Sequence, residues 1–331
     1  LNKILEIDVV NRRAVVQPGV VNLHLQNALA KMGFFYAPDP ASQKVSTIGG
    51  NVGENAGGPH CLKYGLTFNH VLGLTTVLPG GQVVTLGGKA YDEPGFDLVG
   101  LLVGSEGTLG ILTEIVVRIV PLPESCVTLL AIYDSLDNAA KSVSQIMATG
   151  IIPAALELMD RPVIQAVEDS YRSGFPREAE AVLIIEIDGL KDSLASQGEL
   201  IRSICQNNGV VRIEQASSSI DREKLWAGRK GAFGAIARLR PSYMVNDGTV
   251  PRTKLPEVLM KIGEISRRYS LLIGNVAHAG DGNLHPVILF DERDEEEKQR
   301  VIKAGSDILR VCAEAGGTIS GEHGIGLEKK R

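Results

Sequence analysis

An alternation of short apolar runs and longer amphipathic segments between residues 127 and 214 constrains the fold of this chain most. Consecutive β-branched and other apolar residues predict strands, and apolar residues that recur every three or four positions predict helices. The predicted order is strand 127–133, helix 136–148, strand 154–159, strand 181–187, helix 191–207 and strand 210–214. A β-α-β-β-α-β order with its helices packed on one face of an antiparallel sheet is the ferredoxin-like arrangement. We therefore expect an α+β fold that contains this arrangement.

The first third of the chain has a different pattern, in which β-branched runs and glycine dominate and helical periodicity is rare. Strands are predicted at residues 4–10, 14–17, 71–77, 83–86 and 115–120, and helices at 22–31 and 97–102. The pattern changes at Pro121-Leu122-Pro123. A chain of 331 residues is long enough for two domains that each bury a core, so we expect domains at residues 1–122 and 123–331.

Charge and hydropathy argue against two classes of protein, those that bind nucleic acid and those that span a membrane. A net charge of −5 gives no reason to expect nucleic acid as a partner. No apolar run approaches the roughly 20 residues of a membrane span, and the first residues lack the layout of a signal peptide. We expect a cytoplasmic protein, and peripheral attachment to the inner membrane stays open. Because the chain starts without Met inside a predicted strand, a fragment truncated at both ends is expected.

The four cysteines are scattered, at positions 61, 126, 205 and 312, with no Cys-x-x-Cys spacing. This spacing indicates neither a disulfide framework nor an iron–sulfur cluster. Reduced and mostly buried thiols are expected.

Two glycine-bracketed loops contain three of the six histidines and the carboxylate of Glu322. The first is His278-Ala-Gly-Asp-Gly-Asn-Leu-His285, and the second is Gly321-Glu322-His323-Gly324. Apolar runs at 271–276 and 287–290 flank the first loop, and its Asp-Gly pair favours a tight turn. His278 and His285 are therefore expected near the mouth of a β-hairpin.

Two imidazoles and a carboxylate are an ordinary ligand set for a divalent transition metal. We predict that His278, His285 and Glu322 bind one such ion, Zn, Mn or Fe, and leave a coordination position open to substrate. His323 would then stay free for proton transfer. The alternative is that the histidines cap turns and the glycines serve only backbone geometry.

Three glycine-rich clusters stand out in the first domain. They are residues 46–51 (Ser-Thr-Ile-Gly-Gly-Asn), 55–58 (Asn-Ala-Gly-Gly) and 104–111 (Gly-Ser-Glu-Gly-Thr-Leu-Gly-Ile). Glycine lets backbone N–H groups approach a ligand closely and form concave anion sites. The clusters match neither a Walker A motif nor a Gly-x-Gly-x-x-Gly fingerprint, so they indicate neither a nucleoside triphosphate nor a nicotinamide site. Tight turns explain each cluster alone, whereas together they favour a large phosphate-bearing cofactor.

These clusters and residues 38–42 (Pro-Asp-Pro-Ala-Ser) resemble the FAD-contacting segments of the vanillyl-alcohol-oxidase-type flavoproteins. The second half resembles the FAD-linked 2-hydroxy-acid oxidases and dehydrogenases in its motifs at 225–230, 247–251, 278–285 and 321–326. Within that family the chain is most similar to the glycolate oxidase FAD-linked subunits, and next to D-lactate and D-2-hydroxyglutarate dehydrogenases. The resemblance covers essentially the whole chain.

The resemblance implies both a fold and a cofactor. Residues 1–122 would be the C-terminal part of a PCMH-type FAD-binding domain, and residues 123–331 a ferredoxin-like substrate (cap) domain cut short at its C-terminus. The family carries an earlier glycine-rich loop before Leu1 and a further segment beyond Arg331. The residues expected to contact FAD are Pro40, Ser42, Ser46, Thr47, Gly50, Gly53, Asn55, Ala56, Gly57, Glu106, Gly107, Gly110 and Ile111.

The resemblance also implies a reaction, the FAD-dependent oxidation of a small 2-hydroxy acid to the 2-oxo acid. His323 would be the base, Arg229 would bind the substrate carboxylate through its guanidinium fork, and the metal would polarise the hydroxyl. Relatives that act on a dicarboxylate tend to have a polar residue where this chain has Val287, which favours glycolate or D-lactate. Reduced FAD would pass electrons to quinone or to a partner. The expected partners are an iron–sulfur electron-transfer subunit and a second FAD-binding-type subunit.

Three other functions stay open. The same motifs are compatible with a D-2-hydroxyglutarate dehydrogenase and with a catalytically silent FAD-binding subunit. A silent subunit, however, needs neither the metal ligands nor the base. A metallohydrolase would use the same His/Glu set to activate water. A metallohydrolase would not need the glycine clusters of the first domain, because hydrolysis requires no large cofactor. For Arg229, the alternative is an ion pair on a helix surface.

Overall fold

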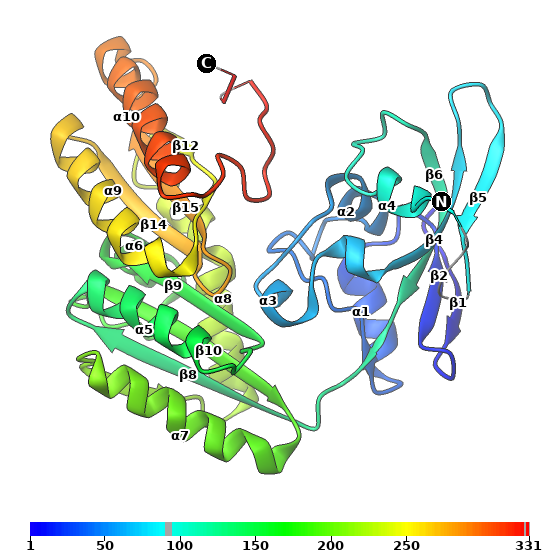
Figure 1. Cartoon of the computed structure of the whole chain (residues 1–331), viewed down its shortest axis with the longest axis horizontal. Helices are drawn as coiled ribbons and strands as arrows, with labels where there is room; N and C mark the ends of the chain where they lie inside the picture. The colour runs from blue at the N-terminus through cyan, green and yellow to red at the C-terminus, as the bar shows by residue number, and fades with distance from the viewer. Residues whose placement is uncertain (90–94, 328, 331) are drawn as a thin grey trace. The chain divides into compact units, whose positions relative to one another are not determined.

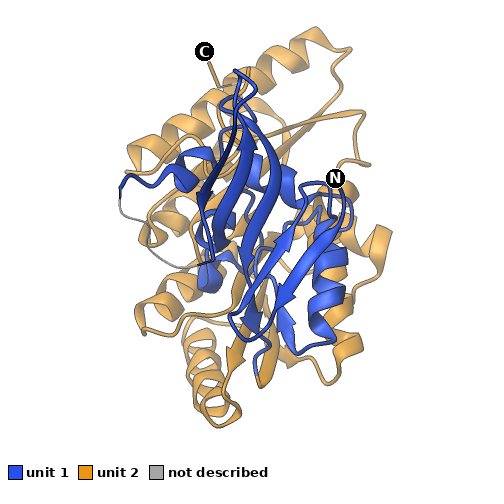
Figure 2. Ribbon diagram, turned by 90° about the vertical axis from the view of Figure 1, so that its right-hand side faces the viewer, with its two compact units in different colours: residues 1–123 blue, residues 124–331 orange. Residues whose placement is uncertain are grey.

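The computed structural model of the chain describes residues 1–89, 95–327 and 329–330, and it divides into two compact units, residues 1–123 and 124–331 (Figure 2). Each unit has its own hydrophobic core. None of the described helices is both long enough and apolar enough to cross a membrane.

The first unit is built on a five-stranded antiparallel sheet with the strand order β1-β2-β6-β4-β5 (Figure 1). Its strands are β1 (Ile4–Asp8), β2 (Arg13–Val16), β4 (Val71–Val77), β5 (Val83–Gly87) and β6 (Ile111–Arg118), and β3 (Phe34–Phe35) pairs separately with β7 (Val120–Pro121). Its helices are α1 (Asn22–Ala30), α2 (Ile48–Glu54), α3 (Cys61–Tyr64), the 3-10 helix η1 (Thr67–His70) and α4 (Leu98–Leu102). Leu25 of α1 and Ile48 of α2 join Leu74 and Ile115 of the sheet in the core.

The expected strands of this unit are present, but the glycine cluster at 46–51 differs from the expectation. The last four of its six residues form the start of helix α2 instead of a loop. Thr47 caps this helix, because its hydroxyl accepts the Gly50 N–H at 3.1 Å. Ile48 and Val52 are buried on one helix face, and this burial offsets the low helix propensity of the intervening glycines.

The second unit is built on an eight-stranded antiparallel sheet with the order β11-β8-β10-β9-β14-β15-β12, and β13 also pairs with β15. Its strands are β8 (Ser125–Tyr133), β9 (Ala155–Asp160), β10 (Ala181–Gly189), β11 (Arg212–Gln215), β12 (Ser242–Val245), β13 (Gly248–Thr249), β14 (Leu272–His278) and β15 (Asn283–Phe290). Its helices are α5 (Leu136–Ala148), α6 (Arg161–Tyr171), α7 (Lys191–Asn207), α8 (Ser219–Ile236), η2 (Arg252–Lys254), α9 (Leu255–Tyr269) and α10 (Glu295–Glu314). The order β11-β8-β10-β9 is that of the ferredoxin-like arrangement, whose fourth, first, third and second strands lie side by side.

Helices cover both faces of this sheet (Figure 1). On one face α6 and α8 pack together, and their apolar side chains share a core cluster with Leu130 and Ile132 of β8. Strand residues that alternate with these two point to the opposite face. There α5 contacts α7 and α9, and α9 contacts α10.

The ferredoxin-like prediction is confirmed and extended by elements that the pattern does not predict. Helix α6 lies between β9 and β10, where Pro162 in the first turn and the buried Val163 and Val167 are the sequence signals for it. Helices α8 and α9 are likewise not predicted. The hairpin β14–β15 pairs with β9, so that one continuous sheet carries the ferredoxin-like strands and both histidines of the first glycine-bracketed loop.

Candidate active site

The first glycine-bracketed loop forms the tip of the β14–β15 hairpin. His278 is the last residue of β14 and pairs with Asn283 at the start of β15, while His285 pairs with Val276. Gly282 closes the turn with φ +77°, and a Cβ at this position would lie 2.2 Å from the Val250 carbonyl oxygen. Only glycine fits this turn, which therefore fixes the register that brings the two imidazoles together.

The three predicted metal ligands converge. The Nε2 atoms of His285 and His278 lie 3.2 Å and 3.6 Å from Glu322 Oε1, and one candidate ligand atom from each residue lies within 4.8 Å of the others. The two imidazole rings meet edge to face, with centroids 5.3 Å apart. Two ring nitrogens and one carboxylate oxygen at this spacing can hold one divalent ion and leave coordination positions open.

The charges of the cluster shift its pKa values. Burial raises the pKa of Glu322, but hydrogen bonds from His278 and His285 and the charges of these rings lower it well below its ordinary value. Burial lowers the pKa of His285. Burial also lowers the pKa of His278, but the charge and hydrogen bond of Glu157 outweigh this effect and raise the pKa to about 10. A metal ion would have to displace the proton that His278 holds.

His323, the predicted base, lies beside this cluster. Its ring stacks on that of His285, with centroids 4.9 Å apart and an interplanar angle of 15°, and its Nε2 lies 3.9 Å from Glu322 Oε1. Its side chain is 43% exposed, whereas that of His285 is 1% exposed. The imidazole of His323 can therefore exchange a proton with a bound molecule or with solvent.

Glu157 is a member of this cluster that sequence reasoning missed. It lies on β9, next to β14, and its Oε1 is 2.9 Å from His278 Nδ1. Its Oε2 contacts Arg229 Nη2, and the two side chains are 1% and 3% exposed. A glutamate in the middle of an otherwise apolar strand, as in Ala155-Leu156-Glu157-Leu158-Met159, was the available signal, because carboxylates are rarely buried without a partner.

Arg229, the predicted substrate-carboxylate residue, is buried instead of lying on a helix surface. Close helix packing brings it to Glu157, since a Cβ at Gly228 would lie 2.4 Å from Ser173 Oγ and one at Gly274 would lie 2.3 Å from Ile236 Cδ1. The Nη2 of Arg229 is also 3.5 Å from His278 Nδ1. Its Nε has no hydrogen-bond partner among the described residues, so the guanidinium keeps a free N–H donor.

Asp247 is a second buried carboxylate that sequence reasoning did not assign to the site. Its Oδ2 accepts the backbone N–H groups of Gly321, Glu322 and His323 at 2.9, 2.9 and 2.8 Å. Burial raises the pKa of Asp247, but these N–H groups and the charges of His323 and His285 lower it below its ordinary value. One carboxylate from the segment between β12 and β13 thus holds the second glycine-bracketed loop, and its Oδ1 lies 3.7 Å from His285 Nδ1 of the hairpin.

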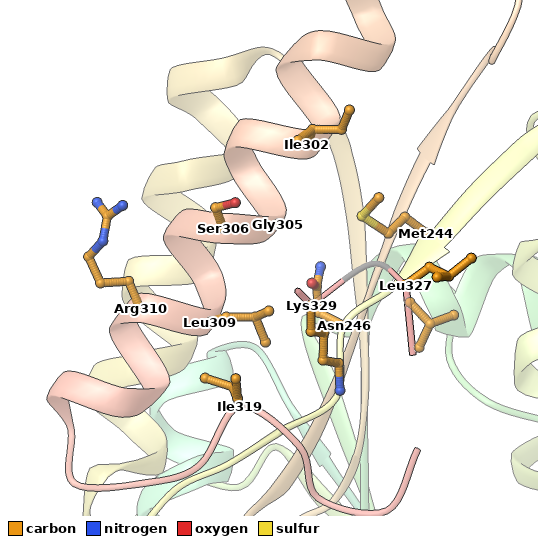
Figure 3. A pocket seen from close by; sticks show the side chains of 11 residues that line it. Met244, Asn246, Ile302, Gly305, Ser306, Leu309, Arg310, Ile319, Leu327 and Lys329 are labelled. Carbon is orange, nitrogen blue, oxygen red and sulfur yellow. The ribbon is translucent and has the colours of Figure 1, made fainter. Parts of the chain in front are cut away.

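A cavity of about 400 Å³ lies beside Asn246, between α10, β12 and the last described segment (Figure 3). Its walls are mainly apolar, with Met244, Ile302, Leu309 and Leu327 among them. Lys329 also lines it and donates to the backbone oxygen of Asp247 at 3.2 Å. None of the three predicted metal ligands lines this cavity.

The predicted FAD residues belong to the first unit, where a cleft of about 210 Å³ opens between α2 and the 104–111 loop. Among these residues, Gly53, Gly107, Gly110 and Ile111 line it. The Glu106 N–H donates to the Gly53 oxygen at 3.0 Å, which ties the loop to the helix. At Gly53 and Gly107 an added Cβ would meet no described atom within 4 Å, so the backbone faces open space as close approach by a large cofactor requires.

The other predicted FAD residues do not line this cleft. They are Pro40, Ser42, Ser46, Thr47, Gly50, Asn55, Ala56, Gly57 and Glu106. Several of them hold the backbone in shape instead. Thr47 caps α2, Asn55 ends it with φ 51° and accepts the Phe68 N–H at 2.8 Å, and the Ala56 oxygen accepts the Thr67 hydroxyl at 2.7 Å.

Comparison with known protein families matches both units. The model of the FAD linked oxidases, C-terminal domain, matches residues 122–331, and an FAD binding domain model matches residues 1–87. The chain is 48% identical to the glycolate oxidase subunit GlcD of Escherichia coli over 99% of this chain and 66% of the relative. It is 46% identical to the GlcD subunit of Bacillus subtilis over 99% and 70%, and 32% identical to a D-lactate dehydrogenase of Archaeoglobus fulgidus over 98% and 71%. The chain therefore spans about two thirds of the length of these relatives.

Solved structures share the fold. An alkyldihydroxyacetonephosphate synthase superposes with a TM-score of 0.77 at 21% identity, over 96% of this chain and 62% of that one. A p-cresol methylhydroxylase superposes with a TM-score of 0.73 at 15% identity, over 96% and 70%. At these identities the likeness supports the expected α+β fold class and not a shared activity.

Proposed function

The chain belongs to the FAD-linked oxidase family, and from this we propose that the full-length protein oxidises a small 2-hydroxy acid, glycolate or D-lactate, to the 2-oxo acid. The names of the relatives support this substrate class, because they include glycolate oxidase subunits and D-lactate dehydrogenases. The observation that carries the proposal is the convergence of His278, His285 and Glu322 beside the stacked, half-exposed ring of His323.

FAD is the proposed cofactor of the first unit. The glycine-lined cleft between α2 and the 104–111 loop fits a large cofactor, because Gly53 and Gly107 leave the backbone open to close approach. When bound, FAD supplies the hydride acceptor. The protein's own task is to hold the cofactor through backbone N–H groups of the loop and the apolar side chain of Ile111.

The proposed metal would sit on His278, His285 and Glu322. The donor set fits, since the Nε2 atoms of both rings face the same carboxylate oxygen. A divalent ion held there would polarise the substrate hydroxyl and stabilise the developing alkoxide. The ion is Zn, Mn or Fe, in keeping with imidazole and carboxylate ligands.

The remaining roles fall to side chains of the second unit. His323 takes the hydroxyl proton on its imidazole, and its exposure lets the proton leave to solvent afterwards. Arg229 offers its free Nε–H and its charge to the substrate carboxylate. Val287 is fully buried in the core cluster with α6 and α8, so its bearing on substrate size stays a prediction.

Electron exit from the reduced flavin requires a partner or quinone. The relatives named as subunits support an assembly with other chains, and we propose an iron–sulfur subunit and a second FAD-binding-type subunit as the partners. Among the described residues the four cysteines form no disulfide, and none of them belongs to a group that could hold a metal ion. A cytoplasmic location with peripheral attachment to the inner membrane stays a prediction of the sequence.

The deciding experiment is anaerobic mixing of the full-length protein, loaded with FAD, with glycolate, D-lactate, L-lactate and D-2-hydroxyglutarate. The flavin absorbance should bleach with glycolate or D-lactate, and an artificial electron acceptor should restore it. Bleaching by D-2-hydroxyglutarate alone would move the substrate assignment to dicarboxylates. No bleaching by any 2-hydroxy acid would refute the proposed reaction.

A further inference from the structure

We infer that Glu157 and Asp247 are positioning residues that hold the proton of His278 and of His285 on Nδ1, so that both Nε2 atoms face Glu322. Each carboxylate lies behind one histidine, on the side away from Glu322. The inference rests on the proposed function, because it concerns how the chain prepares the proposed metal ligands. It assigns a task to two buried acids that the proposed reaction leaves without one.

The first pair is Glu157 with His278. The β9 and β14 strands pair at Leu158 with Ala277, and one residue further along, Glu157 Oε1 lies 2.9 Å from His278 Nδ1. The other oxygen of Glu157 contacts Arg229, so both oxygens are engaged by separate groups. A carboxylate accepts hydrogen bonds and donates none when ionised. The Nδ1 atom of His278 must therefore carry a proton, and the proton that a metal ion displaces is the one on Nε2.

The second pair is Asp247 with His285. Asp247 is 0% exposed and His285 is 1% exposed, and Asp247 Oδ1 lies 3.7 Å from His285 Nδ1. Neither of these two atoms has a hydrogen-bond partner among the described residues. Buried polar atoms seldom stay unpaired, and each of these two faces the other. A shortening of roughly 0.5 to 1 Å would make the bond and fix Nε2 toward Glu322.

The first pair has the geometry that orients histidine in metal sites, and the second pair has the same arrangement at a longer distance. A histidine that binds a metal usually donates its other N–H to a carboxylate or carbonyl, which fixes the tautomer and the ring orientation, and loss of that partner typically costs roughly 10- to 100-fold in metal affinity. The two acids do more than this. Glu157 also holds Arg229, and Asp247 also holds the loop that carries Glu322 and His323.

Amide substitutions test the inference because they preserve size and remove one acceptor. In Glu157→Gln the single side-chain oxygen must face Arg229, which has only donors, so the amide NH2 is left to face His278 Nδ1. His278 must then accept there and carry its proton on Nε2, where it blocks the metal. In Asp247→Asn the oxygen stays with the three loop N–H groups and the NH2 faces His285 Nδ1, with the same result. Both variants should bind Zn²⁺ about 10- to 100-fold more weakly than the parent.

The control is Glu186→Gln. Glu186 lies on β10 of the same sheet, is 1% exposed, and holds Arg222 through two hydrogen bonds of 2.6 and 2.8 Å. It is thus a second buried glutamate paired with an arginine of α8, away from the two histidines.

Glu157→Asp is a rescue variant. It keeps two acceptor oxygens on a shorter side chain, so it should recover part of the Zn²⁺ affinity that Glu157→Gln loses.

The measurement is Zn²⁺ affinity of the full-length protein by chelator competition, with circular dichroism and FAD content as checks of folding. The inference holds if Glu157→Gln and Asp247→Asn lose Zn²⁺ affinity while Glu186→Gln keeps it. It fails if all three bind Zn²⁺ equally well, or if the parent binds none. If either amide variant does not fold, ¹⁵N-histidine spectra of the Zn²⁺-loaded parent decide, because coordination through Nδ1 of either ring would overturn the inference. Flavin bleaching by substrate is scored separately and tests only the proposed reaction.

Discussion

His323 stacks on His285, its ring 4.9 Å from that of the buried histidine and tilted by 15°. The stack holds an exposed imidazole beside the proposed ligand group of His278, His285 and Glu322. We expect His323→Gln to slow flavin reduction by glycolate or D-lactate by about 10² to 10⁴, since glutamine cannot take the proton. Stopped-flow absorbance measures the rate, and FAD and metal contents should not change. The matched control is His24→Gln on the exposed face of α1, and an unchanged rate in His323→Gln would place proton removal elsewhere.

Removing the carboxylate ligand should remove the metal. Glu322→Gln keeps the size of the side chain but loses the charge that faces both Nε2 atoms. We expect the metal content to fall from near one per chain and most activity to be lost, while FAD stays bound. Elemental analysis after gel filtration gives the metal content. Less than about 0.1 equivalent of metal in the active parent protein would contradict the assignment, because a polarising role needs near-full occupancy.

Arg229→Lys should show how much of substrate binding depends on the positive charge of Arg229 and how much on its planar guanidinium. Lysine keeps a positive charge near Glu157 but loses the planar fork and the free Nε–H. A lost hydrogen bond to a charged group is worth about 1.5 to 3 kcal/mol, so KM for glycolate should rise roughly 10- to 100-fold with a smaller change in kcat. Steady-state kinetics with an artificial acceptor measure both. Arg222→Lys on the same helix is the control, and equal KM values in the two variants would place the carboxylate site elsewhere.

Filling the glycine cleft should expel FAD and leave the fold intact. Gly53 lies in α2, and a Cβ there would meet no described atom within 4 Å, so Gly53→Leu puts its side chain into the cleft while favouring the helix. We expect FAD retention after gel filtration to fall sharply. Acid precipitation of the parent protein should release free FAD, as expected for noncovalent binding. Gly234→Leu, at an open position of α8, is the control, and full FAD retention in Gly53→Leu would exclude this cleft as part of the site.

Asp160 should make stability depend on pH. Burial raises its pKa to about 7 from the ordinary value of 3.8, and Asn275 Nδ2 donates to it at 2.7 Å. Between about pH 4 and pH 7 the native chain holds a proton that the unfolded chain has lost, so the free energy of unfolding falls as pH rises, by up to about 1.4 kcal/mol per pH unit. Asp160→Asn removes this dependence. The Tm of the variant relative to the parent should increase from about pH 5 to about pH 8, and a constant difference would show that Asp160 titrates normally.

Much of the fold can be predicted from the sequence because it is encoded locally. The runs at 71–77 and 181–187 are apolar enough to be strands wherever they pack, and Asp281-Gly282 fixes the hairpin that carries the histidines. Helix α8 escapes prediction because Gly228, Gly231 and Gly234 interrupt its helical pattern. Two of these glycines are present for close packing on Ser173 and Tyr171, and that packing is a tertiary property.

The candidate site also has a part that is encoded locally and a part that depends on tertiary structure. His278, His285 and Glu322 lie in short motifs whose residue types predict metal binding. Glu157, in contrast, contacts a residue 121 positions later in the chain, His278. Only the register of β9 against β14 brings these two together. The role of Asp247 is equally hidden, because it depends on the backbone of a loop and not on the identity of the side chains there.

The loop around Glu322 has one more consequence. Three consecutive amides that converge on a single oxygen form a nest of the kind that captures phosphate or sulfate in many proteins. Here the captured anion is Asp247, which is tethered to the same chain 74 to 76 residues earlier. A tethered anion cannot be diluted or washed away. The loop conformation around Glu322 therefore needs no bound ion from solution. Free phosphate cannot bind to these three amides, because Asp247 already accepts their hydrogen bonds.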